Sequence, residues 1–166
     1  MKNLIYQHLS EDAKRQICTW HYDGEYTIYN LPSYEEMQMH QMGFMKPDTA
    51  KQYYGFWDNA TLVGYIKISE KNADVSIGIG VKPDLCGRQY GQQILSLACT
   101  IAHTQYPGKP LCLEVRTWNT RAIKCYEKAG FRIDGQPYEL TTKIGSGTFY
   151  RMVKDSPIPT NKGAKQ

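Results

Sequence analysis

The sequence has no long apolar run, no paired cysteine motif and no strongly basic stretch, and each absence excludes a class of protein. No run approaches the length of a transmembrane helix, and the first residues lack the apolar core of a signal peptide, so no membrane partner is expected. The five cysteines are odd in number and scattered, which argues against a disulfide framework and a zinc site, and no metal is predicted. A reduced, cytoplasmic setting fits this cysteine usage best.

The charge is close to balanced and gives no sign of a nucleic-acid partner. Twenty Lys and Arg residues face 16 Asp and Glu residues, and part of the net charge of +4 lies at the end of the chain, in Lys162 and Lys165. No basic cluster with interleaved aromatic residues is present, as a nucleic-acid groove would need. The 166 residues suit one compact domain, predicted over residues 1–154, followed by a Pro-, Lys- and Gly-rich tail over residues 155–166 that is expected to be disordered.

The order of predicted elements indicates an α/β fold. Residues 3–8 read as a strand, Ser10 caps a helix through about residue 20, and Ser33 opens a second helix through about residue 42. An antiparallel pair over residues 52–57 and 62–69 follows, then strands over 75–81 and 111–115, a helix after each of these, and closing strands over 131–133 and 149–153. This order predicts a mixed central sheet flanked by about four helices.

Residues 75–97 carry the most informative pattern. Apolar residues alternate up to Val81, Pro83 ends the strand, and Gly87 and Gly91 bracket a tight turn before a helix with apolar residues at helical spacing. A turn that opens a helix presents unpaired N–H groups and the positive end of the helix dipole, a combination that binds phosphate. The alternative is an ordinary strand–loop–helix connection without a ligand.

The turn, V-K-P-D-L-C-G-R-Q-Y-G-Q-Q-I-L, resembles the acetyl-CoA pyrophosphate loop of the GNAT N-acetyltransferase superfamily, V-x-P-x-x-R-G-x-G-x-G-x-x-L-L. Two positions depart from that pattern, because Cys86 replaces the basic or amide residue and Gln89 replaces the middle glycine. The resemblance implies the GNAT fold, acetyl-CoA as cosubstrate and direct transfer to an amine. The cofactor-binding residues that it implies are Ile79, Gly80, Val81, Cys86, Gly87, Arg88, Gln89, Tyr90, Gly91, Gln92, Asn119 and Tyr126.

A second segment, residues 113–131, resembles the GNAT sequence L-E-V-x-x-x-N-x-x-A-I-x-x-Y-E-x-x-G-F, and is similar to that of bacterial enzymes that acetylate ribosomal-protein N-termini. By this resemblance Glu114 is the catalytic base and Tyr126 the catalytic acid. Other interpretations remain open: Glu114 as a solvated carboxylate or an ion pair with Arg116, Tyr126 as a packing residue, and Asn119 as a helix N-cap.

Two further residues bear on the chemistry. Cys125, beside Tyr126, invites a covalent acyl-cysteine mechanism, but no histidine is close in sequence to activate it, so direct transfer in a ternary complex is preferred. His103 is expected to be a solvated helix residue.

The acceptor is less well determined. Aromatic residues concentrate near the first two helices, among acidic residues that would attract a cation: Trp20, Tyr22, Tyr26, Tyr29 and Tyr34 with Asp23, Glu25, Glu35 and Glu36. These residues slightly favour a small primary amine over a peptide N-terminus, although an aromatic core beside a solvated acidic face is an equal alternative. The chain is expected to act as a monomer or homodimer. The competing function is a non-catalytic acyl-CoA-binding sensor or scaffold.

Overall fold

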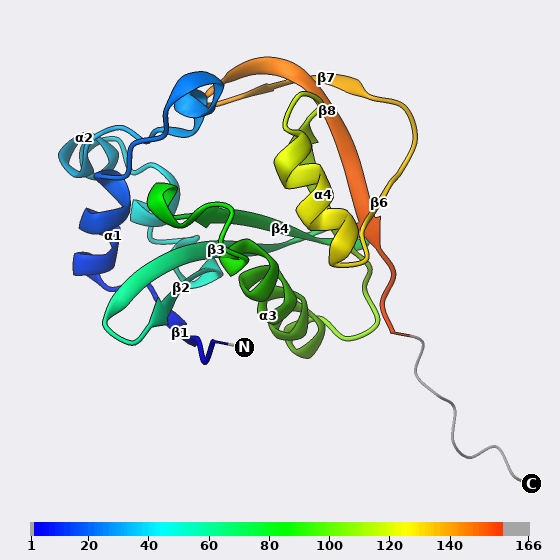
Figure 1. Ribbon diagram of the computed structural model, residues 1–166, viewed down its shortest axis with the longest axis horizontal. Helices are drawn as coiled ribbons and strands as arrows, with labels where there is room; N and C mark the ends of the chain where they lie inside the picture. The colour runs from blue at the N-terminus through cyan, green and yellow to red at the C-terminus, as the bar shows by residue number, and fades with distance from the viewer. Residues whose placement is uncertain (1, 158–166) are drawn as a thin grey trace, which may run out of the picture.

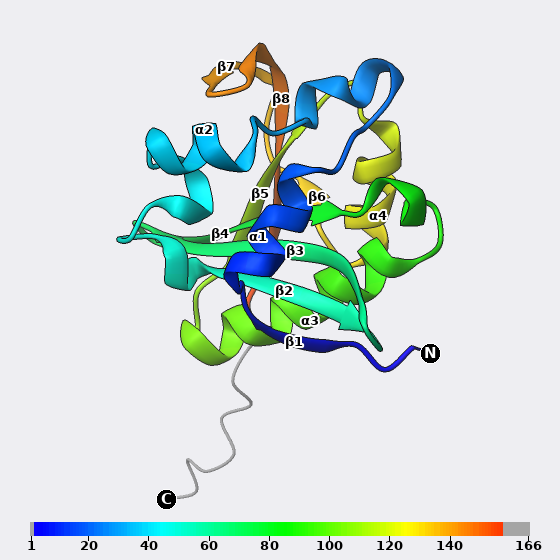
Figure 2. The ribbon, with the colours of Figure 1, turned by 90° about the vertical axis from the view of Figure 1, so that its left-hand side faces the viewer.

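Eight strands form one mixed sheet in the computed structural model, which describes residues 2–157 (Figures 1 and 2). The sheet order is β1-β2-β3-β4-β5-β8-β6. β7 pairs with the first half of β8, and β6 pairs with its last residues. The strands are β1 Ile5–His8, β2 Tyr53–Asp58, β3 Thr61–Lys71, β4 Asp74–Val81, β5 Leu111–Arg116, β6 Arg132–Ile133, β7 Tyr138–Thr142 and β8 Gly145–Lys154. The predicted α/β fold with a mixed sheet is confirmed.

Four α-helices lie within the described residues: α1 Glu11–Cys18, α2 Tyr34–Met39, α3 Tyr90–Gln105 and α4 Thr120–Lys128. Ser10 and Ser33 cap α1 and α2 as predicted, since each side-chain oxygen accepts a backbone N–H in the first turn. Both helices end earlier than the sequence suggested, and a short helical turn, Gly24–Tyr29, follows α1. No helix in residues 2–157 has the length and apolar character to span a bilayer.

The sheet is covered on both faces by separate hydrophobic cores. One core packs α3 and α4 against the sheet and includes Phe56, Ile66 and Leu95. The other packs α1 and α2 and includes Ile17 and Phe44. Successive side chains of a strand point to opposite faces, so one set of strands supplies both cores. In Figure 1, α3 and α4 lie away from α1 and α2, which are at the left, and α3 contacts α4.

Strands β4 and β5 are neighbours only over a short stretch. Their parallel pairing covers Val75↔Leu111 and Ser76↔Cys112, and beyond these residues β4 and β5 are not paired with each other within the described chain. β4 continues to Val81 and β5 to Arg116, so the strands separate towards their C-terminal ends. The sheet is therefore open between the two segments that carry the sequence motifs.

The C-terminal half departs from the predicted elements at β7 and β8. Strand β8 begins at Gly145, earlier than the predicted residue 149, and forms a hairpin with β7, which was not predicted. His103 also differs from the prediction, because both of its ring nitrogens are buried without a hydrogen-bond partner. Residues 155–157 follow β8 without regular structure, and residues 158–166 of the predicted disordered tail lie outside the described residues.

Candidate active site

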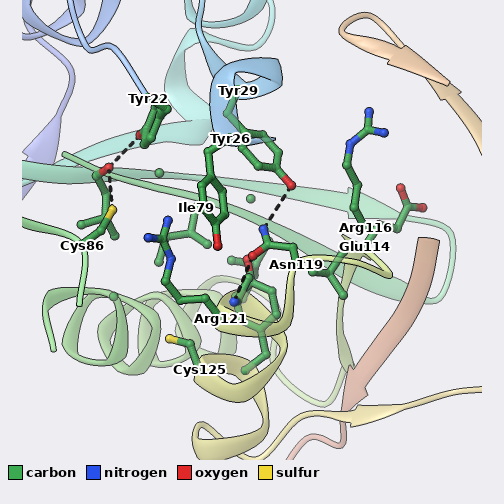
Figure 3. Close-up of a pocket in the computed structure, with 18 of the residues that line it drawn as sticks. Tyr22, Tyr26, Tyr29, Ile79, Cys86, Glu114, Arg116, Asn119, Arg121 and Cys125 are labelled. Atoms are coloured by element: carbon green, nitrogen blue, oxygen red, sulfur yellow. Dashed lines mark hydrogen bonds between the residues drawn. The ribbon is translucent and has the colours of Figure 1, made fainter. Parts of the chain in front are cut away.

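The opening between β4 and β5 is a cavity of about 1000 Å³ (Figure 3). The N-terminus of α3, helix α4, the segment around Tyr26 and the β7–β8 turn complete its walls. The structure brings most of the predicted site residues together in this lining: Ile79, Gly80, Val81, Cys86, Gly87, Gln89, Gly91, Gln92, Glu114, Asn119 and Tyr126. A cavity of this size suits a cofactor-sized ligand.

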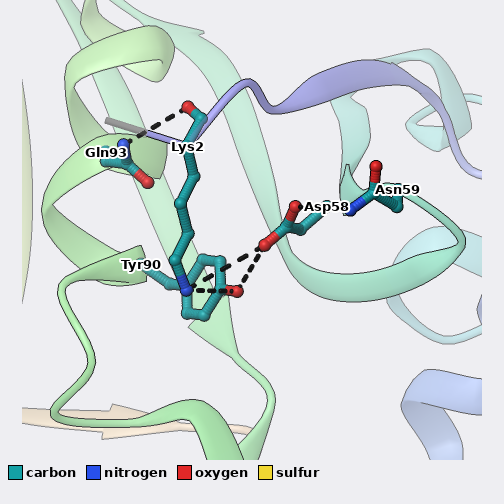
Figure 4. Close-up of polar contacts among 5 residues, drawn as sticks. All are labelled: Lys2, Asp58, Asn59, Tyr90 and Gln93. Atoms are coloured by element: carbon teal, nitrogen blue, oxygen red, sulfur yellow. Dashed lines mark hydrogen bonds and ion pairs between the residues drawn. The ribbon is translucent and has the colours of Figure 1, made fainter.

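The side chains of Arg88 and Tyr90 lie outside the cavity lining. Tyr90 is 5% exposed, and its hydroxyl donates to Oδ2 of Asp58 at 2.6 Å and accepts from Nζ of Lys2 at 2.6 Å (Figure 4). That ring joins the start of α3 to the β2–β3 turn. The backbone N–H of Tyr90 remains a predicted cofactor contact, whereas that of Arg88 donates to the Leu85 backbone oxygen at 3.3 Å.

The loop before α3 is shaped to expose backbone N–H groups. Gly87 and Gln89 adopt left-handed conformations, with φ of 79° and 67°, and the Gln89 side chain makes no capping hydrogen bond. The other three α-helices of the described residues each have an N-cap side chain that accepts a first-turn N–H. Helix α3, 16 residues long, therefore starts at the cavity without side-chain acceptors for its first amides. This end of the cavity suits an anionic group such as a pyrophosphate.

The two cysteines of the cavity remain thiols at neutral pH. Burial raises the pKa of Cys86 and of Cys125 above the ordinary range for a cysteine. The Cys86 Sγ donates weakly to the backbone oxygen of Lys82, at 3.6 Å. A neutral thiol is a poor nucleophile, which argues against acyl transfer through Cys125.

Glu114 and Tyr126 face the cavity from β5 and α4. Glu114 is exposed between buried neighbours on β5, as the alternation of a strand requires. Burial raises the pKa of Tyr126, so its hydroxyl stays protonated and able to donate. The Tyr126 ring also packs edge-on against Phe131, with centroids 6.5 Å apart, so it contributes to packing as well. Glu114 and Arg116 do not form an ion pair within residues 2–157, so that interpretation of Glu114 is not supported.

Asn119 links α4 to the segment that follows α1. Its Oδ1 accepts the N–H of Ala122 at 3.2 Å, which confirms the N-cap interpretation. Its Nδ2 donates to the Tyr29 hydroxyl at 3.1 Å. Nearby, the guanidinium carbon of Arg121 lies 4.1 Å from the Tyr26 ring centroid. These contacts hold the two tyrosines over the open part of the sheet.

The predicted acceptor residues divide into two groups. Tyr22, Tyr26 and Tyr29 line the cavity, and the Tyr22 hydroxyl donates to the backbone oxygen of Val81 at 2.7 Å. Trp20 and Tyr34 are instead buried in the core beneath α1 and α2. None of Asp23, Glu25, Glu35 and Glu36 lines the cavity, so none of these carboxylates contacts a cation inside it.

The charge of the lining was not anticipated from the sequence. Among the described residues that line the cavity, Glu114 alone is acidic, whereas five are cationic: Arg116, Arg121, Lys124, Lys128 and Lys143. The three on α4 recur at helical spacing, a signal that places them on one face. Lys143 gave no such signal, because the β7–β8 turn that carries it was not predicted. Arg116, on β5, was considered only as a partner for Glu114.

Comparisons with known proteins agree with this architecture. The family model described as Acetyltransferase (GNAT) family matches residues 13–131. A chimera of the spermidine N-acetyltransferase SpeG from Vibrio cholerae and hSSAT has a TM-score of 0.71 and 19% identity, covering 92% of this chain and 95% of that chain. The ribosomal-protein-S18-alanine N-acetyltransferase from Escherichia coli has a TM-score of 0.65 and 18% identity, covering 96% of this chain and 98% of that chain.

The aminoglycoside acetyltransferase AAC(6')-Ib, solved in complex with coenzyme A, has a TM-score of 0.69 and 17% identity, covering 92% of this chain and 95% of that chain. No curated protein sequence matches the chain. At these identities the solved structures show a shared fold. The family model spans well over half of the 166 residues, and the chain therefore belongs to the GNAT family of acetyltransferases.

Proposed function

We propose that the protein is an N-acetyltransferase that moves the acetyl group of acetyl-CoA to a primary amine. The observation that carries this proposal is that one cavity joins an uncapped helix N-terminus at one end to Glu114 and Tyr126 further along it. Proteins of the same fold are described as acting on spermidine, on aminoglycosides and on a ribosomal-protein alanine, all of which offer an amine.

The residues present fit acetyl-CoA, which supplies an activated acetyl group when bound. Among the N–H groups of residues 87–92, that of Arg88 donates to the Leu85 backbone oxygen, and the others would hold the pyrophosphate, since α3 begins beside the cavity without a side-chain cap. The unpaired edge of β4, Ile79–Val81, would offer N–H groups to the thioester carbonyl. Gly91 matters because its missing side chain leaves this wall open beside Val81 and Cys125.

Two side chains would move the protons of the reaction. Glu114 takes a proton from the ammonium group, which leaves the amine able to form a bond to the acetyl carbon. As that C–N bond forms, the C–S bond breaks and the electron pair leaves with sulfur. Tyr126 donates its proton to the thiolate and regains one that the new amide nitrogen loses. The proton balance closes as one ammonium gives one amide, one thiol and one released proton.

Turnover distinguishes this function from the non-catalytic acyl-CoA-binding alternative. Purified protein with acetyl-CoA and a panel of amines should release free CoA, detected with a thiol reagent, and yield acetylated product detected by mass. Tight CoA binding without thiol release on any amine would support the sensor or scaffold instead.

Variants at Gly91 test where the cofactor lies. A Cβ built on Gly91 lies 3.5 Å from Sγ of Cys125 and 3.6 Å from Cγ2 of Val81, so Gly91→Ala fits and serves as the control. Gly91→Val adds two γ-carbons at the wall where the cofactor backbone contacts are expected, and should weaken CoA binding about 10-fold or more. Calorimetric titration with CoA measures both. Equal affinity in a folded Gly91→Val protein would refute the loop assignment.

A further inference from the structure

Arg116 is a buried cation without a carboxylate partner among the described residues. Its side chain, on β5, is 3% exposed and lines the cavity. Its Nη1 donates to the backbone oxygen of Ser146 and its Nη2 to that of Gly145, each at 3.2 Å. Its Nε is buried with no hydrogen-bond partner. Two carbonyls occupy two of the five guanidinium donors, and they leave the positive charge unneutralised.

The β7–β8 hairpin holds this guanidinium in place. Besides the two carbonyls, the Phe149 ring lies beneath it, with the guanidinium carbon 4.7 Å from the ring centroid. Gly147 provides the room, because a Cβ at that position would clash with Nη1 of Arg116. The hairpin therefore fixes a buried cation with unused N–H groups, an arrangement that is costly until an anion binds beside it.

The place of Arg116 in the cavity indicates where a bound anion would lie. Glu114 and Arg116 are two residues apart on β5, so both point to the same face and their Cβ atoms lie about 7 Å apart. Figure 3 shows both at one end of the cavity, with Cys86 of the phosphate-binding loop at the other end. An anion held by Arg116 would thus lie beside the amine that Glu114 deprotonates, away from the pyrophosphate.

We propose, building on the acetyltransferase function above, that the acceptor is an amine that also carries a carboxylate, as amino acids do. Arg116 binds the carboxylate, Lys143 at the β7–β8 turn adds a second positive charge, and Glu114 receives the proton of the amine. The same two cations repel a polyamine, and the acidic residues that would attract one lie outside the cavity. An acceptor without a carboxylate would leave the buried Arg116 guanidinium without an anion, and this cost provides the specificity.

Matched acceptors test this proposal. Several amino acids with uncharged side chains, including phenylalanine, alanine and glycine, are compared with their amides and their decarboxylated amines. Spermidine and short peptides with amidated C-termini, which carry no carboxylate, are in the same panel. The expected result is a kcat/KM about 10- to 100-fold higher for at least one amino acid than for its amide and amine, the range for a hydrogen bond between charged groups. The proposal would be overturned if any of these other acceptors gave a kcat/KM as high as that of every amino acid.

Three variants locate the effect. Arg116→Gln and Gly147→Ala should each reduce the amino acid to amide ratio about 10-fold, and Lys143→Gln should reduce it less because Lys143 is exposed. Arg132→Gln, which removes an exposed arginine paired with Asp155, is the matched control and should keep the ratio. Affinity for acetyl-CoA should not change in Arg116→Gln; an equal loss for acetyl-CoA and amino acid would assign Arg116 to the cofactor and refute the inference.

A binding measurement separates failure of this inference from failure of the proposed function. If no amine is acetylated, the proposed function fails, but calorimetry of the CoA complex with an amino acid and with its amide still tests Arg116. Binding of the acid that is tighter than that of the amide, and that is lost in Arg116→Gln, supports a carboxylate site. Equal binding of acid and amide overturns it.

Discussion

Replacing Gln89 by glycine should stabilise the protein, although Gln89 lies in the loop that we propose binds the cofactor. Its φ of 67° is left-handed, a conformation that costs a residue with a Cβ about 1–2 kcal/mol. The exposed side chain makes no capping hydrogen bond, so its removal loses no such bond. Glycine destabilises the folded protein by about 0.5–1 kcal/mol, because the unfolded chain gains conformational freedom. The expected net gain is about 0.5–1 kcal/mol.

That gain should appear as a Tm higher by about 1–4 °C, since about 2–4 °C per kcal/mol is typical at this chain length. Gln41→Gly is the matched control, because Gln41 follows α2 with φ of 50° and does not line the cavity. Gln41→Gly should gain less than Gln89→Gly, because it also loses the hydrogen bond that Nε2 of Gln41 donates to the Gln38 backbone oxygen at 2.9 Å. Only Gln89→Gly should affect CoA, leaving its affinity equal or higher. A lower Tm for Gln89→Gly beside a higher Tm for Gln41→Gly would refute the argument that Gln89 is strained.

Three other outcomes are expected. Tyr126→Phe keeps the packing ring and removes the proton donor, so kcat should fall about 100-fold with little change in Tm; an unchanged kcat, where chemistry limits turnover, would leave Tyr126 as a packing residue. Tyr90→Phe removes the hydroxyl bonded to Asp58 and should cost about 1–3 kcal/mol in chemical denaturation while leaving CoA affinity intact; a weaker CoA complex would return this side chain to the cofactor site. Burial, and secondarily Lys154, lower the pKa of His103 from its ordinary 6.5, so the unfolded chain binds more protons and stability falls as the pH drops below 6.5. His103→Leu should therefore lose less Tm than the wild type between about pH 7.5 and about pH 5.5, and parallel losses would contradict this account.

The elements with strong local patterns could be predicted from the sequence, and those fixed by distant contacts could not. Strand β4 and helix α3 follow from their apolar spacing, and the cap at Asn119 follows from residue type. Strand β7 alternates half-buried and exposed residues over only five positions, Tyr138–Thr142, and this short pattern was not recognised. Its pairing with β8 is the contact that establishes it as a strand.

The same distinction applies to the candidate site. The loop and the second motif identified most of the lining, because each is continuous in sequence. Tyr90 was assigned to the cofactor from its place in the loop, yet its side chain turns towards Asp58 and Lys2, contacts made by segments far from it in the chain. Arg116 was considered only as a partner for Glu114, because nothing local indicated that the carbonyls of Gly145 and Ser146 would hold it.

The short pairing between β4 and β5 makes rigidity depend on what fills the gap. Beyond Ser76, the amide hydrogens of β4 that face β5 have no strand partner among the described residues, so they should exchange rapidly with deuterium in the free protein. A ligand lying between the strands would slow that exchange and connect β1–β4 to β5–β8. Tm should then rise as the ligand concentration is increased. Without ligand, local opening of the sheet should occur first between β4 and β5.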